Sequence, residues 1–423
     1  MRKLTGNLFL ENMSPKEEAI AEKVESILPE IRKHAAQTDE QGAFPKSHLN
    51  LFQQTGLTGL MVPQEYGGLE GSLRDLTATT FALGTACPST ALCFFFHCST
   101  SSRGDLALKA IKQGLFNDKE ESKVRDFAEK VLGRMGHEGL WFGNFASESS
   151  KSQNSAVTID TEAEPVDGGY LLTGVKSFGC STGIADRYLV TAKMKGSNDA
   201  EGLATFFVDP DANGIRERTK WNAIGMRGTA THGLIMDKVF VPEDEALTVN
   251  GAFTKMMSVS RGSFVGNQLA GTACYLGAAH EVYQSTLDRL MTRTFADTGR
   301  PLAEAPMQQE IIGKMTQELE TATMWLRRQL ELETSEPPIL AKNKVIQQWR
   351  LCKGVVSEAA FAVASYALKS GGTGGTDNNG TNARALRDLS MGLVQAFPPE
   401  RGRLEAAKMI TSSMEQSLFG VKN

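Results

Sequence analysis

The sequence predicts a mostly helical protein with a β-domain in its middle. We expect an N-terminal helical domain, a middle antiparallel β-barrel or sandwich, and a C-terminal four-helix bundle. Two observations predict this order. Apolar residues recur at helical spacing in the first and last thirds of the chain, and between these regions the spacing changes to short strands separated by turns. We therefore place the domains at residues 1–139, 140–248 and 249–423.

The N-terminal domain begins with a helix behind Ser14. This residue is predicted to be the N-cap, followed by Pro15 in the first turn and by the acidic Glu17. A loop at residues 59–68 contains a proline and a glycine pair. Residues 75–98 are apolar on almost every side, which predicts a helix buried deep in a bundle. The apolar positions of the first helix are Ala19, Val24, Ile27, Leu28 and Ile31.

The middle domain contains short apolar runs separated by turn residues, which is typical of a small antiparallel sheet. The first two runs flank the turn Asp167-Gly168-Gly169. Six strands are predicted, at residues 156–159, 170–173, 188–192, 204–208, 234–236 and 239–241.

The C-terminal domain returns to long amphipathic stripes joined by loops, which predicts an antiparallel helix bundle. Two loops are marked by their composition, at residues 335–338 and 370–381. The stripes run through Ile311, Met315, Leu319, Leu326 and Leu330, through Val355, Ala359, Phe361, Val363 and Ala367, through Leu386, Leu389 and Leu393, and through Leu404, Met409 and Ile410.

Composition argues against several classes of protein. The 423 residues carry a net charge of −4, whereas a nucleic-acid binder normally has a basic excess. The longest apolar stretch, residues 91–96, is far shorter than the about 17 residues that span a bilayer. The six cysteines match no zinc-binding spacing, so no metal is expected. No apolar leader follows Met1, and we expect a soluble, cytoplasmic protein that contacts no membrane.

Four segments in a fixed order carry a family resemblance. They are residues 56–68 (Gly-Leu-Thr-Gly-Leu-Met-Val-Pro-Gln-Glu-Tyr-Gly-Gly), 146–148 (Ala-Ser-Glu), 167–178 with Ala185-Asp186, and 224–231 with Val239-Phe240-Val241-Pro242. Together they resemble the acyl-CoA dehydrogenase superfamily of flavoproteins over essentially the whole chain. The resemblance implies bound FAD, with FMN as a possibility, and a substrate that is an acyl-CoA or acyl-carrier thioester. It also implies a homotetramer or homodimer, since the family's FAD site spans two subunits.

A flavin ring needs flat apolar surfaces on its faces and hydrogen-bond donors at its rim. Phe145, Ala146 and Ser147 supply such groups at one predicted strand end, and Phe178 and Cys180 at another. By resemblance, Ser147 replaces the family's Thr at the ring's rim, Phe178 its Trp beside the ring, and Cys180 its Thr or Ser. In the alternative interpretation, Phe178 is a core aromatic of the β-domain and Ser147 caps a strand end.

Two further segments resemble the family's phosphate-binding elements. The family's Arg-x-x-Phe-Gly corresponds to Arg293 and Phe295, although the spacing differs, and an arginine here could equally be solvated. The family's Gln-x-x-Gly-Gly-x-Gly loop corresponds to residues around Gly371 and Gly372, with Leu368 in place of the Gln. Glycines allow backbone N–H groups to approach a phosphate closely.

The family's catalytic base is missing from both of its known positions. The first corresponds to Ala396, whose methyl group cannot accept a proton, and the second to Ser260, just before Arg261. A general base typically contributes about 10²–10⁴-fold to the rate. Glu400 is the nearest carboxylate along the chain and a candidate replacement, or it is simply an acidic residue in the first turn of the last helix.

Three functions remain open from the sequence. The first is a flavin-dependent dehydrogenase acting on the CH–CH group of an acyl thioester. The second is a flavin monooxygenase that receives reduced flavin from a separate reductase, because such members of the family also lack the base. The third is a non-catalytic flavin-binding member. The run Phe94-Phe95-Phe96 would crowd a long acyl chain and so suggests a short or unusual substrate, unless these rings belong to the core.

Overall fold

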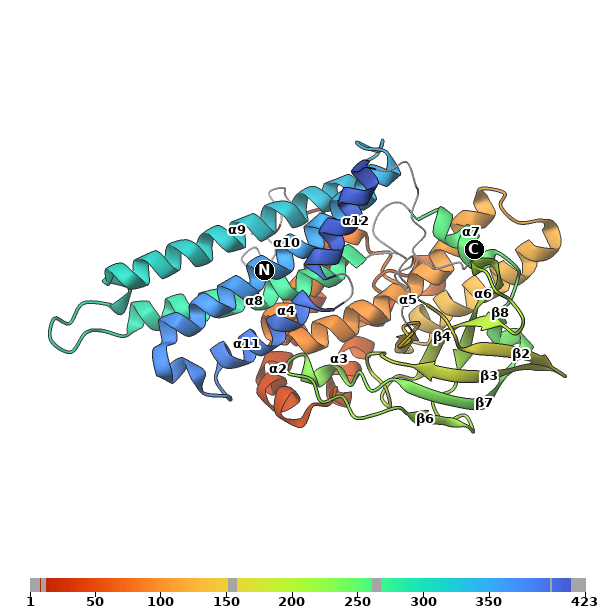
Figure 1. The fold of residues 1–423 in the computed structure, drawn as a ribbon, viewed down its shortest axis with the longest axis horizontal. Coiled ribbons are helices and arrows are strands. Elements are labelled where there is room, and N and C mark those ends of the chain that lie inside the picture. The colour runs from red at the N-terminus through yellow and green to blue at the C-terminus, as the bar shows by residue number, and fades with distance from the viewer. Residues whose placement is uncertain (1–7, 9–12, 151–157, 261–267, 396–397, 412–423) are drawn as a thin grey trace.

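The computed structural model describes residues 8, 13–150, 158–260, 268–395 and 398–411. Long helices extend to one end of the molecule and a β-sheet forms the other, with the N-terminal helices between them (Figure 1). The predicted fold class is confirmed. The helices are α2 (Pro15–Gln41), α3 (Lys46–Thr55), α4 (Leu73–Ala86), α5 (Pro88–Lys112), α6 (Asp118–Gly136), α7 (Ala252–Ser258), α8 (Gln268–Thr292), α9 (Pro306–Thr334), α10 (Lys342–Gly371), α11 (Thr381–Ser390) and α12 (Pro399–Thr411).

The predicted start of α2 is confirmed in atomic detail. The Ser14 hydroxyl accepts the backbone N–H of Glu17 at 3.3 Å, and the Ser14 N–H donates to the Glu17 carboxylate at 2.7 Å. This reciprocal capping box satisfies two N–H groups that the first helical turn cannot pair. Pro15 occupies the first turn, where its missing N–H costs nothing.

The predicted single helix over residues 75–98 is wrong, because two helices cover this stretch. α4 ends at Ala86 and α5 begins at Pro88, with Cys87 extended between them (φ −155°, ψ 105°). Proline has no N–H for the helical ladder and its ring clashes with the preceding turn. It also biases the residue before it toward extended backbone, so the chain turns a corner at Cys87.

The described residues form one eight-stranded sheet in the order β6-β7-β3-β2-β4-β5-β8, with β1 beside β4. The sheet is mixed and not purely antiparallel as predicted, since β1 and β2 both pair with β4 in parallel. The strands are β1 (Phe142–Phe145), β2 (Glu162–Val166), β3 (Gly169–Lys176), β4 (Arg187–Met194), β5 (Leu203–Val208), β6 (Ile215–Glu217), β7 (Leu234–Pro242) and β8 (Ala246–Leu247).

One predicted strand is misplaced. Of residues 156–159, the last two are not in a strand and the first two lie outside the described residues. The strand before the turn is β2, which carries two glutamates and Pro165. The turn itself is confirmed, with Gly168 at φ 73° between β2 and β3. The two runs 234–236 and 239–241 form the single strand β7.

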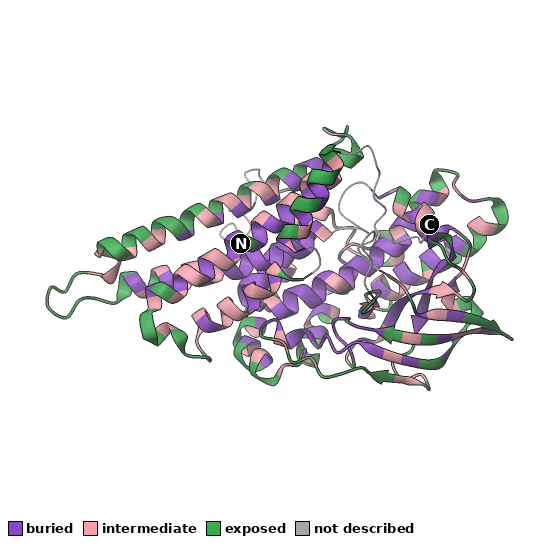
Figure 2. Ribbon diagram, in the orientation of Figure 1, coloured by how far each residue is buried: buried purple, intermediate pink, exposed green. Residues whose placement is uncertain are grey.

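α8, α9, α10 and α12 pack together in the C-terminal domain, with α11 against α8 and α10. α10 with the turn that follows it, Lys342–Thr376, is long and apolar enough to cross a membrane by length and composition alone. More than half of its apolar window is buried inside the protein, as expected of a core helix. Figure 2 shows buried residues concentrated where α4, α5, α8 and α10 meet, whereas the far end of the α8–α9 hairpin is exposed.

An aromatic cluster joins the N-terminal domain to the sheet. Phe94 stacks on Phe52 with ring centroids 4.8 Å apart, and His97 stacks on Trp141 at 4.3 Å. Phe94 and Phe95 are both at most 1% exposed. These two rings therefore belong to the core and are not evidence for a short or unusual substrate. The His97 ring also accepts the Phe142 N–H through Nδ1 (3.0 Å), which attaches α5 to β1.

Candidate functional site

A small surface ledge forms where the ends of β1 and β3 come together. The backbone N–H of Ser177, just after β3, donates to the carbonyl of Ser147, just after β1, at 2.9 Å. Ser147 is exposed, and the Phe178 side chain beside it is 49% exposed. We call Ser147, Ser177 and Phe178 the ring ledge. The alternative interpretation of Phe178 as a core aromatic is therefore wrong, because a core ring would not expose half of its surface.

Two aromatic residues support the ring ledge. Phe145 is fully buried beneath it and packs edge-on against Tyr188 with centroids 4.7 Å apart. A Cβ at Gly179 would lie 2.1 Å from the Phe145 ring, so only glycine fits there. Trp221, from the β6–β7 loop, meets Phe178 edge-to-face at 6.0 Å. Trp221 was not predicted, since no local pattern links it to a residue 43 positions earlier.

A buried ion pair holds the backbone behind the ledge. The Lys176 ammonium contacts the Glu148 carboxylate, with 0% and 3% of the two side chains exposed. Lys176 also donates to the carbonyls of Ala146 (3.3 Å) and Thr191 (2.5 Å), so it joins the chain after β1 to β3 and β4. Burial lowers the pKa of Lys176, and the charge of Glu148 opposes this shift. The half-buried Ala146 therefore has a fixed backbone position.

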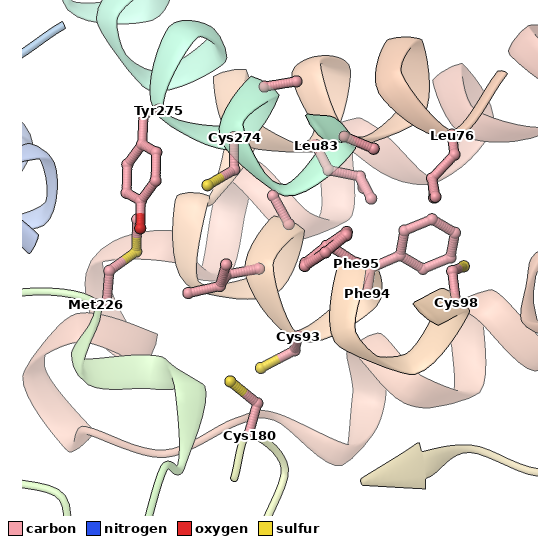
Figure 3. Close-up of a cluster of buried hydrophobic side chains, with 14 of the residues drawn as sticks. Leu76, Leu83, Cys93, Phe94, Phe95, Cys98, Cys180, Met226, Cys274 and Tyr275 are labelled. Carbon is pink, nitrogen blue, oxygen red and sulfur yellow. The ribbon is translucent and has the colours of Figure 1, made fainter. Parts of the chain in front are cut away.

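The thiol of Cys180 lies in the core and not on the exposed side of the ledge. Cys180 is 6% exposed and faces Cys93 of α5, as Figure 3 shows. Its sulfur also lies 3.4 Å from the hydroxyl of Thr231.

The predicted phosphate-binding residues gather at the tip of the helical domain. Arg293 and Phe295 follow α8, and Gly371 and Gly372 end α10. Arg289, one turn before Arg293, donates to the Ser370 hydroxyl at 2.9 Å and so joins the two segments. Gly372 has φ 56° and ψ −152°, a conformation essentially restricted to glycine. Figure 1 shows this tip at the opposite end of the molecule from the sheet.

The tip is electrostatically suited to an anion. Burial lowers the pKa of Arg289, and the positive charge of Arg293 lowers it further. Two neighbouring guanidinium groups repel one another unless an anion lies between them. The tip therefore places two positive charges near one another, at the opposite end of the molecule from the ring ledge.

The structure places Glu400 in the first turn of α12. Its side chain is 76% exposed and pairs with Arg403 at 3.3 Å. This is the position expected of a first-turn acid. Ala396 and Arg261 lie outside the described residues. Ser260 is 9% exposed, and its N–H donates to the Met257 carbonyl at 3.2 Å.

Buried polar groups contact the segment just before Ala396. Lys353 of α10 donates to the Gly392 carbonyl at 2.5 Å, and the Tyr275 hydroxyl donates to the Gln395 side chain. Burial lowers the pKa of Lys353 to about 8. The apolar stripe of α10 gave no sign of this lysine's role, because its partner is a backbone carbonyl 39 residues away.

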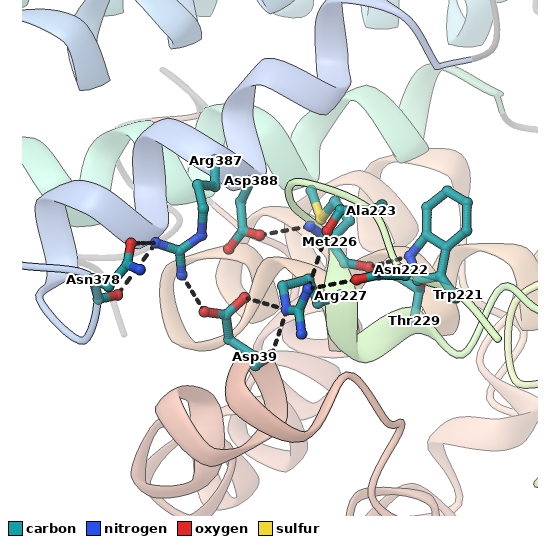
Figure 4. A network of polar contacts seen from close by, with 10 residues as sticks. All are labelled: Asp39, Trp221, Asn222, Ala223, Met226, Arg227, Thr229, Asn378, Arg387 and Asp388. Atoms are coloured by element: carbon teal, nitrogen blue, oxygen red, sulfur yellow. Dashed lines mark hydrogen bonds and ion pairs between the residues drawn. The ribbon is translucent and has the colours of Figure 1, made fainter.

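A second polar cluster joins α2, the β6–β7 loop and α11 (Figure 4). The Asp39 carboxylate pairs with Arg387. The Asp39 backbone carbonyl accepts a hydrogen bond from Arg227 Nε at 2.9 Å. Asp388 is fully buried and accepts the Met226 N–H at 2.6 Å, and burial raises its pKa to about 7. A cavity of about 500 Å³ opens beside this cluster. The partners of Arg387 and Asp388 are distant in the chain, so no local pattern predicted this cluster.

Comparisons with known proteins agree with this arrangement. The acyl-CoA dehydrogenase N-terminal, middle and C-terminal domain models match residues 14–107, 145–239 and 269–397. The chain is 26% identical over 391 residues to cyclohex-1-ene-1-carbonyl-CoA dehydrogenase of Syntrophus aciditrophicus, covering 90% of this chain and 85% of the relative. It is also 26% identical to mitochondrial isovaleryl-CoA dehydrogenase of Arabidopsis thaliana, covering 88% and 86%.

Solved structures show the same fold at lower identity. TdsC from Paenibacillus sp. A11-2, in complex with FMN and indole, superposes with a TM-score of 0.79 at 20% identity, covering 94% of this chain and 99% of TdsC. Butyryl-CoA dehydrogenase from Megasphaera elsdenii gives 0.76 at 18% identity, covering 95% and 100%. Three consecutive models of one family match most of the sequence in order. The chain therefore belongs to the acyl-CoA dehydrogenase superfamily of flavin-dependent oxidoreductases.

Proposed function

We propose that the protein is a flavin-dependent monooxygenase that receives reduced flavin from a separate reductase. The observation that carries the proposal is the environment of Glu400, the candidate base, which is 76% exposed and paired with Arg403. The family's usual base position holds Ala396. Removal of an α-proton from an acyl thioester needs a positioned proton acceptor, whereas oxygen transfer from a reduced flavin does not use that carboxylate.

The carboxylates described near the ledge and α11 are engaged by other groups. Glu148 is neutralised by Lys176 and also accepts the Asp160 N–H at 2.6 Å. Asp388 accepts the Met226 N–H and lies fully buried. Neither group is placed to replace the missing base, which supports a reaction that begins without proton abstraction by a carboxylate.

The residues of this chain fit a flavin in two parts. The exposed face of Phe178 and the exposed hydroxyl of Ser147 suit the face and edge of an isoalloxazine ring. Arg293 and the backbone around Gly372 suit a phosphate. When bound, the flavin would supply the redox chemistry, either with oxygen or with hydride. Both FAD and FMN carry the phosphate that Arg293 would bind.

These two parts lie at opposite ends of one chain, so we propose that they meet in a homodimer or homotetramer. The tip of one subunit would complete the ring ledge of another. Apolar side chains near the tip are unusually exposed, which supports an interface with another subunit that would cover them. They are Met291 (65%), Phe295 (37%) and Met307 (79%).

Acyl-thioester dehydrogenation is the second candidate, and the sequence relatives favour it. The two relatives described above are both named as acyl-CoA dehydrogenases and align along most of their length. Phe94 and Phe95 are core residues, so they give no reason to exclude an ordinary acyl chain. Among the structures, TdsC is named as a dibenzothiophene monooxygenase, and KijD3 was solved with FMN and a dTDP-sugar (TM-score 0.78, 20% identity).

The two candidates separate in a paired experiment. Protein loaded with FAD or FMN is mixed anaerobically with a panel of acyl-CoA thioesters, and Glu400→Gln serves as the control. The monooxygenase proposal expects no bleaching of the flavin, but oxygenated product when reduced flavin, oxygen and a candidate amine, phenol or thiophene are supplied. Flavin bleaching by a thioester would instead establish the dehydrogenase. Hydrogen peroxide as the sole product with every substrate would also contradict monooxygenation.

A further substitution sharpens this test. Ala396→Glu restores the family's carboxylate directly after a segment, residues 392–395, that Lys353 and Tyr275 contact. If the cleft otherwise suits thioesters, this variant should reduce its flavin with acyl-CoA while the parent protein does not. If neither protein reacts, the cleft itself does not suit thioesters, and the missing base is not the reason that they fail to react.

A further inference from the structure

Two buried cysteines from different domains face one another across the contact between α5 and the turn after β3. Cys93 is 1% exposed and Cys180 is 6% exposed, and Figure 3 shows their sulfur atoms pointing toward each other. Each thiol also shifts the pKa of the other. All six cysteines are free thiols in the structure.

Two threonines of the β6–β7 loop hold both thiols. The Thr229 carbonyl lies 3.5 Å from the Cys93 sulfur and accepts the Ser181 N–H at 2.9 Å. The Thr231 hydroxyl lies 3.4 Å from the Cys180 sulfur, and the two threonine hydroxyls hydrogen-bond at 2.7 Å. Both cysteines are therefore attached to the same short segment, and their proximity does not depend on one contact alone.

The backbone around Cys180 is equally constrained. Ser181 has φ 62°, a left-handed conformation that non-glycine residues adopt only when the surroundings impose it. Thr182 fixes the turn twice, through its hydroxyl to the Gly179 carbonyl (2.7 Å) and through its N–H to the Ala230 carbonyl (3.1 Å). This turn directs the Cys180 side chain inward to Cys93.

The pKa values of the two thiols are shifted in opposite directions. Hydrogen bonds from Cys93 and Thr231 lower the pKa of Cys180, although burial opposes the shift. Burial and the bond to Cys180 raise the pKa of Cys93. Burial also raises the pKa of Cys87, Cys98, Cys274 and Cys352. A thiolate is the nucleophile in thiol oxidation, so Cys180 is favoured as the attacking sulfur.

We propose that Cys93 and Cys180 are a redox-active dithiol that closes to a disulfide when the protein meets hydrogen peroxide. The Cys180 thiolate attacks one peroxide oxygen, the O–O bond breaks, and a sulfenic acid and hydroxide form. The Cys93 sulfur then attacks the Cys180 sulfur, the S–O bond breaks, and a second hydroxide leaves. The Cys93 proton and one from solvent convert these hydroxides to water. The pair of thiols loses two electrons and the peroxide gains them.

The disulfide would connect the N-terminal domain directly to the ring ledge. Cys180 lies two residues after Phe178, and Cys93 lies in the second turn of α5. A bond between them would fix the ledge against α5 and restrict any movement between these two elements. This dithiol is independent of the proposed monooxygenase function, since it needs neither bound flavin nor substrate.

The test is peptide mapping of the full-length protein without a reducing agent, before and after exposure to hydrogen peroxide. We expect a cross-linked pair of peptides carrying Cys93 and Cys180, lighter by two hydrogen atoms and separated again by dithiothreitol. Cys98→Ser is the matched control, because Cys98 lies on the same helix and is also buried. This variant should form the same cross-link to the same extent.

A second variant distinguishes the two roles. In Cys93→Ala, the Cys180 sulfenic acid has no resolving partner and should be trapped by dimedone, whereas Cys180→Ala should give no dimedone adduct at Cys93. The proposal is overturned if the wild-type protein, still folded by circular dichroism, keeps both thiols free. It is equally overturned if Cys180 is oxidised to sulfinic acid without a cross-link, or if Cys180 pairs with a different cysteine.

Discussion

The Asp388 carboxylate of α11 accepts the backbone N–H of Met226 at 2.6 Å in a site fully closed to water. Met226 has φ 49°, and a Cβ at its neighbour Gly225 would lie 2.0 Å from the Arg387 carbonyl. The β6–β7 loop and α11 are therefore in direct backbone contact, with Asp388 as the acceptor that fixes the loop.

Asp388 should make folding stability depend on pH. Burial raises its pKa in the folded protein to about 7, from an ordinary value of 3.8. The folded state then binds more protons than the unfolded state between these values, so stability falls as pH rises from about 4 to about 7. Each pKa unit corresponds to about 1.4 kcal/mol. In Asp388→Asn this contribution should disappear, as measured by urea unfolding across that range.

The control for Asp388 is Asp288→Asn, an exposed carboxylate on α8. It should follow the wild-type pH profile. An Asp388→Asn protein whose stability relative to wild type is the same at pH 4 and pH 7 would contradict the raised pKa.

His97 should act in the opposite direction. Its Nε2 lies 2.8 Å from the Thr58 carbonyl, and burial lowers its pKa to about 4. Stability should fall as pH decreases from about 6.5 to about 4, because the unfolded state takes up the proton first. His97→Phe should lose this dependence but be less stable at neutral pH, by about 1–3 kcal/mol for each unsatisfied buried group. Unfolding of both proteins over this range measures the difference.

The Glu148–Lys176 pair should be important for stability. Glu148→Gln leaves a buried ammonium without its counter-ion, which typically costs about 3–5 kcal/mol. The exposed pair Lys195–Glu164 offers a matched control, and Glu164→Gln should leave the urea midpoint unchanged. Equal midpoints for the two variants would mean that the buried pair does not hold the ledge.

Phe178 should contribute to flavin binding and not to stability. Because its side chain is 49% exposed, Phe178→Ala removes little core packing. Loss of a stacking ring should weaken flavin binding roughly tenfold, measured by quenching of flavin fluorescence. Phe240→Ala is the control, since Phe240 is 48% exposed on β7 away from Ser147. If both variants weaken binding equally, the ring ledge is not the flavin site.

Arg293 should recognise the phosphate of the flavin and not its ring. Arg293→Gln should weaken FMN or FAD binding roughly tenfold and leave riboflavin binding unchanged, because riboflavin has no phosphate. Arg300→Gln, in the same tip and paired with Glu304, is the control. A similar loss for riboflavin would place Arg293 outside the phosphate site.

Local signals in the sequence predicted the parts of this protein that depend on neighbouring residues. The capping box at Ser14 and the turn at Gly168 depend on residues three or fewer positions apart, and both were found. Pro88 also carried a local signal that the apolar run around it obscured. That Ser147 and Phe178 lie close together was predicted only from the resemblance to the family. The two residues follow separate strands, so no local pattern links them.

Long-range pairings could not be predicted in this way. β2 carries two glutamates and a proline. Its composition is therefore less typical of a strand than the composition of residues 156–159, where the strand was predicted. Its place depends on pairing with both β3 and β4. Likewise, the contact of Cys93 with Cys180 and that of Asp388 with Met226 each join segments more than 80 residues apart. Residue type gives no information about such partners.

The separation of Phe178 from Arg293 along the length of the chain has a genetic consequence. If each flavin draws its ring contacts from one polypeptide and its phosphate contacts from another, two defective alleles can rescue one another. A mixed assembly of Phe178→Ala and Arg293→Gln chains contains one cleft with both defects and one with neither. Co-expression should therefore restore part of the flavin content that either allele alone lacks, a form of intragenic complementation.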